Sequence, residues 1–357
     1  MPEIELCAEE AAQVALLLSM PLHYCGLVVE NTNRCNASCA MCYQSSGPSG
    51  PEGANATCMD VSLIKRFIRE AADIETIASR FHLAGGEAFL YLDDCYEIFR
   101  SAQASGFALI SAATNAYWGA SMHKARNVCA SLRDAGLNSL EVSWDYWHSE
   151  FIPAASVNHC LLACREAGID TTLRLLTTRS HPMEEALSYL SVEAVETADR
   201  ITSGPVFATG RAATTLSRDE FYYSRASLNN MCYRTLNLTI NAFGQVFPCC
   251  AGFDQNKNYI CGNVADEPLD VIVARMDNDP ILRQLVFSGV SSFLPILEEA
   301  GYRIGEDYFN ICHLCSTIFT NAEYTDAIRC SFERRQQEAL MKAVSRLEAV
   351  FGASERK

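Results

Sequence analysis

Between residues 24 and 206 the chain repeats one pattern, in which a short apolar run is followed by a longer amphipathic stretch. The apolar runs predict strands over residues 25–30, 80–84, 108–113, 139–143, 171–177 and 200–206. The amphipathic stretches predict helices over residues 61–72, 92–104, 123–135, 156–167 and 184–197. Strands and helices that alternate in this way form parallel βα units, in a partly open barrel or a doubly wound sheet. In both folds, ligands bind at the carboxyl ends of the strands.

The alternation stops after residue 210. Two apolar runs, at residues 235–242 and 245–249, flank Phe243-Gly244 and predict a β-hairpin. Further helices are expected over residues 268–276, 280–287 and 332–351. We therefore divide the chain into an N-terminal helical lead-in (1–22), a βα domain (23–215), a smaller α+β domain (216–330) and a C-terminal helix with its tail (331–357).

Composition narrows the classes of partner. The 357 residues include 28 basic and 43 acidic side chains, for a net charge of −15, which argues against a nucleic-acid partner. No apolar run approaches the roughly 20 residues of a membrane-spanning helix, so no membrane partner is expected. The first ten residues, MPEIELCAEE, carry acidic side chains where a secretory signal carries basic ones, which predicts a cytoplasmic protein. In that compartment the 17 cysteines indicate metal ligands or catalysis rather than disulfides.

Three of these cysteines follow the first predicted strand directly. Cys35, Cys39 and Cys42 have the spacing CxxxCxxC. Three thiolates can hold three irons of a cubane cluster and leave the fourth iron open to the amine and carboxylate of a small molecule. A structural zinc site would need four ligands, usually with CxxC spacing.

With Gly85-Gly86-Glu87 after the second strand and the βα repeat, this motif resembles the radical S-adenosylmethionine (SAM) superfamily. The resemblance implies a partial (β/α)6 TIM-like barrel with a smaller C-terminal α+β iron–sulfur domain. It also implies that Cys35, Cys39 and Cys42 hold a 4Fe–4S cluster that binds SAM. Reductive cleavage of SAM would then yield a 5′-deoxyadenosyl radical that removes a hydrogen atom from the substrate. A flavodoxin or ferredoxin is the expected electron donor.

Other residues are candidates for binding SAM. Gly85 and Gly86 would let the backbone approach the ligand, and the Glu87 carboxylate would accept from the methionyl ammonium group. Met41 would pack against adenine through its thioether.

Polar residues at the ends of later strands extend this set. Asn115, Ser143 and Asp145 stand where they could bond the cofactor, the last two through its ribose hydroxyls. Arg174 lies in an otherwise apolar or hydroxylic strand and would bind the methionyl carboxylate or form a structural ion pair. His148 would reach the substrate or serve loop packing.

A second set of cysteines lies in the C-terminal region. Cys232, Cys249, Cys312 and Cys315 could close a four-thiolate site, which resembles the Twitch domain, a shortened SPASM domain with one auxiliary 4Fe–4S cluster. The full SPASM pattern continues with two more cysteines, at spacings that here fall on Asn321 and Thr325. Structural zinc is the alternative.

The remaining cysteines of this region leave a choice of roles. Cys250, Cys261 and Cys330 would be packing residues or further cluster ligands, or would donate a hydrogen atom to a substrate radical.

The predicted function is oxidative modification of a ribosomal peptide, a crosslink or a dehydrogenation, because an auxiliary cluster can accept the electron of a substrate radical. A dehydrogenase or epimerase of a small natural product, such as an aminocyclitol or amino sugar, is the alternative. A non-catalytic iron–sulfur carrier or scaffold is a third possibility, against which the open-iron spacing of Cys35 to Cys42 argues.

Overall fold

The structure is a computed structural model, and it describes residues 20–51, 55–223, 231–232, 235–250, 256–305 and 308–354. The helical lead-in predicted over residues 1–22 therefore falls largely outside the described residues, as does the end of the tail.

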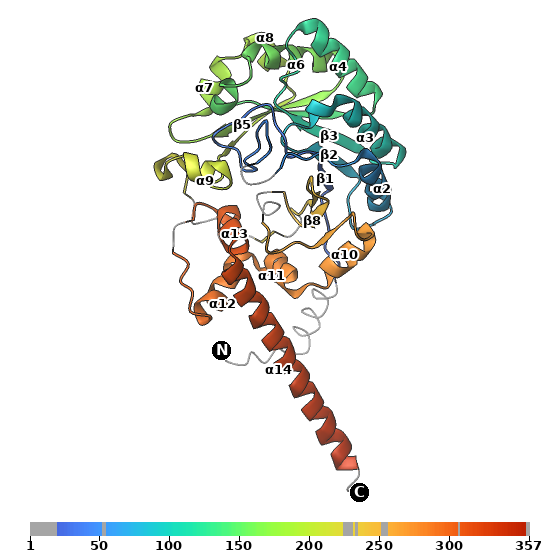
Figure 1. Cartoon of the computed structure of the whole chain (residues 1–357), viewed down its shortest axis with the longest axis vertical. Helices are drawn as coiled ribbons and strands as arrows, with labels where there is room; N and C mark the ends of the chain where they lie inside the picture. Colours follow the sequence, from blue (N-terminus) through green and yellow to red (C-terminus); the bar gives the residue numbers. More distant parts are fainter. Residues whose placement is uncertain are drawn as a thin grey trace.

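Six parallel strands form the larger part of one sheet and pair with one another in chain order, as a partial barrel (Figure 1). Each lies within two residues of a predicted strand. They are β1 (Leu27–Glu30), β2 (Arg80–Ala84), β3 (Leu109–Thr114), β4 (Ser139–Ser143), β5 (Asp170–Thr177) and β6 (Arg200–Pro205).

Helices cover the outer side of these strands (Figure 1). They are α2 (Val61–Ala72), α3 (Leu92–Ala104), α4 (Met122–Asp134), α6 (Ala154–Ala167), α7 (Met183–Ser188) and α8 (Val192–Thr197). Two short helices, α5 (Tyr146–Ser149) and α9 (Arg211–Thr215), follow β4 and β6. Alternate strand residues such as Leu83, Val142 and Leu173 are fully buried in the core. The residues between them point to the opposite side, the interior of the barrel.

The prediction of one helix over residues 184–197 is wrong, because the segment forms two short helices, α7 and α8. Ser191 has an extended backbone, and its side chain accepts a hydrogen bond from the N–H of Ala194. This N-cap starts a new helix, while buried Leu190 anchors the break between the two.

The predicted hairpin is present and continues the same sheet. Strand β7 (Leu238–Ile240) pairs in parallel with β1. Strands β8 (Gln245–Phe247) and β9 (Gly262–Asn263) add antiparallel pairs, which makes nine strands in the described part of the chain. Gly244 turns the hairpin with a φ of +77°, a conformation that favours glycine. The barrel strands and the C-terminal strands therefore share one hydrogen-bonded sheet, and a division of the chain at residue 215 stays a prediction.

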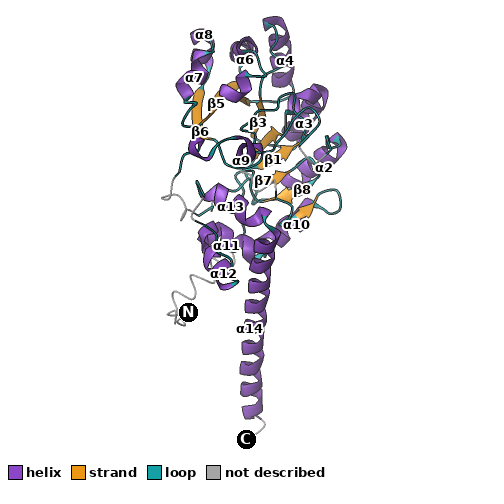
Figure 2. Cartoon of the chain, turned by 60° about the vertical axis from the view of Figure 1, so that its left-hand side comes forward, coloured by secondary structure: helices purple, strands orange, loops and turns teal. Residues whose placement is uncertain are grey.

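The C-terminal region is otherwise helical. Its helices are α10 (Leu269–Asp277), α11 (Pro280–Ser288), α12 (Leu294–Glu299), α13 (Ile311–Thr320) and α14 (Ala322–Ser354). Helix α14 begins ten residues before the predicted start and projects from the body of the molecule (Figures 1 and 2). Among the described helices, none is both long enough and apolar enough to cross a membrane.

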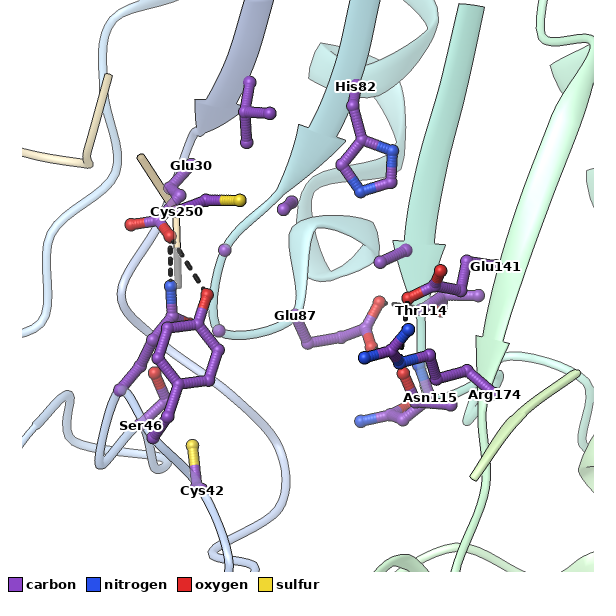
Figure 3. Close-up of a pocket in the computed structure, with 18 of the residues that line it drawn as sticks. Glu30, Cys42, Ser46, His82, Glu87, Thr114, Asn115, Glu141, Arg174 and Cys250 are labelled. Atoms are coloured by element: carbon purple, nitrogen blue, oxygen red, sulfur yellow. Dashed lines mark hydrogen bonds and ion pairs between the residues drawn. The ribbon is translucent and has the colours of Figure 1, made fainter. Parts of the chain in front are cut away.

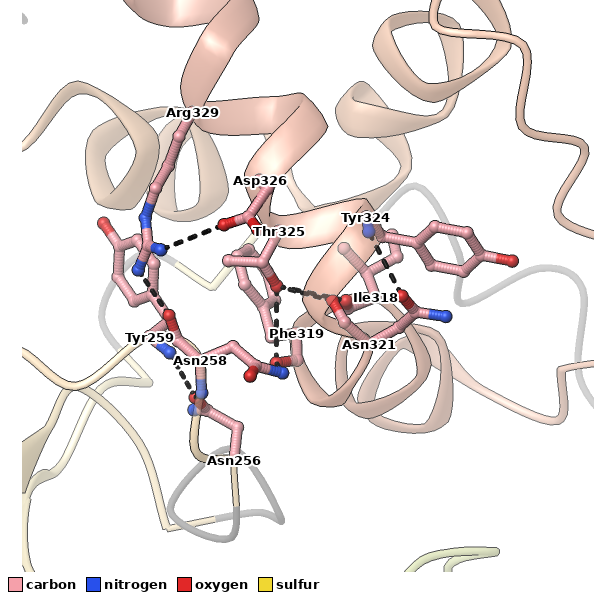
Figure 4. Close-up of polar contacts among 10 residues, drawn as sticks. All are labelled: Asn256, Asn258, Tyr259, Ile318, Phe319, Asn321, Tyr324, Thr325, Asp326 and Arg329. Atoms are coloured by element: carbon pink, nitrogen blue, oxygen red, sulfur yellow. Dashed lines mark hydrogen bonds and ion pairs between the residues drawn. The ribbon is translucent and has the colours of Figure 1, made fainter.

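Asn321 and Thr325 join α13 to α14 (Figure 4). The Asn321 side chain accepts from the N–H of Tyr324 at 3.2 Å, and the Thr325 hydroxyl donates to the Asn321 carbonyl at 2.9 Å. The two positions where a full SPASM pattern would have cysteines thus hold side chains that stabilise a helix junction.

Candidate active site

A cavity of about 650 Å³ occupies the interior of the barrel, a volume typical of small-molecule sites (Figure 3). Inward-facing residues of β1 to β5 line it, together with the loop that follows β1. Most of the predicted site residues meet here. They are Cys35, Cys39, Met41, Cys42, Gly85, Gly86, Glu87, Asn115, Ser143, Asp145, His148, Arg174 and Cys250. Cys261 does not line this cavity.

We call residues 35–46 the cluster loop. Its Cys35 and Cys39 are buried, and burial, followed by the charge of Glu87, raises the pKa of the Cys35 thiol to about 12. Burial also raises the pKa of Cys39. Buried thiols of this kind lose their protons only when a cation replaces them. The donor set therefore fits an iron–sulfur cluster, whose irons Cys35, Cys39 and Cys42 would hold.

Gly85 and Gly86 bring the end of β2 against the residues that precede the cluster loop. The N–H of Gly86 donates to Thr32 O at 2.8 Å, and a Cβ at either glycine would overlap backbone atoms of Thr32 or Arg34. Gly85 also has a φ of +143°. The glycines thus allow a close backbone approach, as predicted, and the structure shows that this approach is to the protein's own chain.

Glu87 is buried and already has three donors from the protein. Its carboxylate accepts from the hydroxyl of Thr114 at 2.8 Å, from the N–H of Asn115 at 2.7 Å and from the N–H of Phe89 at 3.2 Å. Asn115 in turn donates from Nδ2 to Asn36 Oδ1 at 2.9 Å. Glu87 therefore positions the end of β3 against the cluster loop. Its contact with the methionyl ammonium group stays a prediction.

Burial raises the pKa of Glu87 from 4.5 to about 7, although its three donors oppose the shift. The folded protein therefore binds more protons than the unfolded chain between these values, and Glu87 makes the protein less stable as the pH rises from about 4.5 to 7. Glu87→Gln removes this titration. Between pH 4.5 and 7, the unfolding free energy of the cluster-free wild type should therefore fall by about 3 kcal/mol relative to that of the variant. Urea unfolding at pH 5 to 8 measures it, and parallel curves would contradict the assignment.

Asp145 and His148 form a pair on the cavity wall. His148 Nδ1 lies 2.8 Å from Asp145 Oδ1, and Asp145 caps α5 by accepting from the N–H of His148. Burial lowers the pKa of His148, but the Asp145 carboxylate outweighs this effect, and the net shift is upward. Oδ2 of Asp145 is buried without a hydrogen-bond partner. This unpaired acceptor fits a ligand hydroxyl, such as one from the ribose, and Ser143 lines the cavity two residues earlier.

Arg174 pairs with Glu141 of the neighbouring strand at 4.0 Å. The predicted alternative of an ion pair is therefore present. Although the other residues of 171–177 are apolar or hydroxylic, 41% of the Arg174 side chain is exposed. The inward-facing position opens onto the cavity, where the guanidinium remains accessible to an anion.

The four C-terminal cysteines gather at the base of the hairpin and on α13. Cys232 precedes β7, Cys249 follows β8, and Cys312 and Cys315 lie about one turn apart on α13. Burial raises the pKa of Cys315, and the charges of Cys249, Cys232 and Cys312 add to the shift. No three described His, Cys, Asp or Glu side chains converge on a single metal ion. Four thiolates from these segments could hold the four irons of one cubane cluster.

Sequence reasoning missed several polar residues of the cavity. Glu30 accepts hydrogen bonds from Tyr43 and Gln44 of the cluster loop, and His82 lies 2.9 Å from the Ser111 hydroxyl (Figure 3). Burial and the charge of Arg80 lower the pKa of His82 to about 4. The available signal was a polar residue next to apolar residues in a strand, as Glu30 is in LVVE and His82 is in RFHLA.

Family comparisons agree with this geometry. A family model described as the radical SAM superfamily matches residues 29–190, and the SPASM model, described as an iron–sulfur cluster-binding domain, matches residues 232–316. The chain belongs to the radical SAM superfamily. As a radical SAM enzyme it binds SAM and a 4Fe–4S cluster, with auxiliary iron–sulfur binding in the C-terminal region. This confirms the family, the fold class and the cofactors predicted from the sequence.

The radical SAM enzyme is 24% identical over 301 residues to YydG of Bacillus subtilis (strain 168), a protein named for peptide biosynthesis. The match covers 82% of this chain and 91% of YydG. The structure of native anSMEcpe with bound AdoMet has the same fold, with a TM-score of 0.53 and 11% identity over 89% of this chain and 99% of that one. The structure of BtrN in complex with AdoMet and 2-DOIA matches with a TM-score of 0.46 and 13% identity, over 85% of this chain and 98% of that one.

Proposed function

We propose that this enzyme epimerises a residue of a ribosomal peptide. Cleaved at the cluster of Cys35, Cys39 and Cys42, SAM supplies the radical that removes a hydrogen atom from the substrate. The observation that carries the proposal is that the Cys250 thiol lines the same cavity as these three cysteines. The similarity to YydG, a protein named for peptide biosynthesis, supports a peptide as the substrate.

The path of the chain supports a mechanism in which a hydrogen atom is removed from one face of the substrate carbon and another is delivered to the opposite face. The cluster loop follows the carboxyl end of β1, whereas β8 runs antiparallel to β7 and therefore to β1. The chain thus leaves β8 toward the amino ends of the barrel strands before it reaches Cys250. A thiol that approaches from that end would deliver hydrogen to the face opposite the one from which it was removed, which inverts the carbon.

Of the three thiols considered as hydrogen donors, Cys250 lines the cavity, whereas Cys261 and Cys330 do not. Cys261 lies outside the cavity, where its carbonyl accepts from Arg275 at 2.9 Å and burial raises the pKa of its thiol. In the final step the substrate carbon radical takes the hydrogen atom of the Cys250 thiol, so that a C–H bond forms as the S–H bond breaks. This leaves a thiyl radical, which one electron and one proton restore. A flavodoxin or ferredoxin in a reducing cytoplasm would supply the electron.

Oxidation, the outcome predicted from the sequence, differs in its products. In heavy water an epimerised peptide should gain one deuterium, or one mass unit, whereas an oxidised peptide should lose two hydrogens. Peptides encoded beside the gene are the substrates to test by mass spectrometry and chiral amino-acid analysis. Cys250→Ala should abolish epimerisation while still forming 5′-deoxyadenosine, and Cys261→Ala is the matched control. A product two mass units lighter, formed equally by the Cys250 variant, would establish oxidation instead.

A further inference from the structure

The cluster loop is held in place by a residue from the far edge of the barrel. Arg211 begins α9, six residues after the last residue of β6. Its Nη1 donates to the carbonyl of Cys39 at 2.9 Å, and its Nη2 donates to the carbonyls of Ser45 at 2.6 Å and Ser46 at 2.7 Å. The guanidinium therefore contacts the cluster loop on both sides of Cys42.

The backbone next to this side chain adds to the contact. The N–H of Arg211 donates to Cys42 O at 2.9 Å, and the hydroxyl of Thr215 donates to Ala40 O at 2.8 Å. Gly210 has a φ of +58°, and a Cβ there would overlap Tyr43 O. Only a residue without a side chain lets the two segments pass this closely.

Topology explains why such a contact is needed. Strand β6 is one edge of the sheet, and four strands separate it from β1, which leads into the cluster loop. No strand of the described chain pairs with the free edge of β6. Hydrogen bonds from residues 211–215, which follow β6, therefore connect this edge of the barrel to the cluster loop that follows β1.

We propose that Arg211 is a positioning residue that fixes the carbonyls of the cluster loop and thereby the directions of its three thiols. Three of the five carbonyl acceptors are reached by one planar guanidinium, whose fork of N–H groups spans them simultaneously. Lysine keeps the charge but cannot reproduce the fork. This role is independent of which substrate the enzyme modifies.

The test compares Arg211→Lys and Arg211→Ala with the wild type in the reconstituted holoenzyme. Arg126→Lys is the matched control, because Arg126 forms an exposed pair with Glu166 far from the cavity. The readouts are iron content, the EPR spectrum of the reduced protein with and without SAM, and the rate of 5′-deoxyadenosine formation without peptide. A displacement of about 1 Å can lower a rate about 100-fold, so we expect Arg211→Lys to retain the iron of both clusters but lose about 10- to 100-fold in rate.

The EPR signal that SAM induces should change in both Arg211 variants and stay unchanged in Arg126→Lys. A wild-type spectrum and rate in Arg211→Ala would overturn the proposal. Loss of iron from both clusters together with a lower melting temperature in Arg211→Lys would also overturn it, because that result indicates a general role in folding. None of these readouts requires a peptide, so they succeed or fail independently of the proposed function.

Discussion

Replacing Cys39 with alanine should abolish the release of 5′-deoxyadenosine and halve the iron content. The wild type with two cubane clusters should hold about eight irons, and the variant should keep about four, in the auxiliary cluster. The physical reason is that two thiolates cannot hold a cluster that needs three. Cys39 is buried and lines the cavity, so a side chain on the protein surface cannot take its place as a cluster ligand. Anaerobic reconstitution with dithionite and SAM, followed by iron analysis and chromatography, measures both quantities.

Cys58→Ala is the matched control, because Cys58 is a partly buried cysteine. The hydrogen bond described for its thiol goes to the carbonyl of the neighbouring Met59. It should retain all of the iron and the activity. If Cys39→Ala still released 5′-deoxyadenosine at the wild-type rate, the assignment of Cys35, Cys39 and Cys42 to the SAM-binding cluster would be wrong.

Replacing Cys315 with alanine should remove the auxiliary cluster and leave the first one. About four irons should be lost, while slow release of 5′-deoxyadenosine without substrate should continue. Cys315 follows buried Leu314 on α13, and a cluster held by the four thiols would join this helix to the hairpin, so its loss should remove that link. We therefore expect a lower melting temperature as well.

Cys330→Ala is the control for this experiment, because Cys330 is exposed on α14. Its iron content and melting temperature should equal those of the wild type. Loss of all eight irons in Cys315→Ala would show that the first cluster depends on the second. Tightly bound zinc in the wild-type C-terminal site would refute the auxiliary iron–sulfur assignment.

Strands β2 to β5 could be predicted from the sequence because each of them buries one face and leaves the other more exposed. An apolar residue at every second position, as in β2 and β4, fixes which side chains face the helices. The break between α7 and α8 could not be predicted in the same way. Ser191 fits an amphipathic helix as well as it fits an N-cap, and only the packing of Leu190 decides between them.

Local motifs identified the cysteines and glycines of the site, whereas contacts across the barrel were not visible in the sequence. Arg211 lies 165 to 172 residues from the carbonyls that it binds, and carbonyl acceptors leave no pattern in the side chains. The environment of Glu87 likewise depends on Thr114 and Asn115, which reach it only through the register of β2 and β3. The sequence therefore allowed us to predict which residues form the site, but not which groups they bind through hydrogen bonds.

The parallel pairing of β7 with β1 has a consequence for electron flow. Strand β1 leads into the cluster loop, and the hairpin of β7 and β8 has Cys232 before it and Cys249 after it. A hydrogen-bonded ladder, rather than a flexible linker, therefore sets the spacing between the two sets of thiols. Electron tunnelling between centres held in this way would occur over a fixed path and require no domain movement. The two clusters would therefore keep the same separation throughout the reaction.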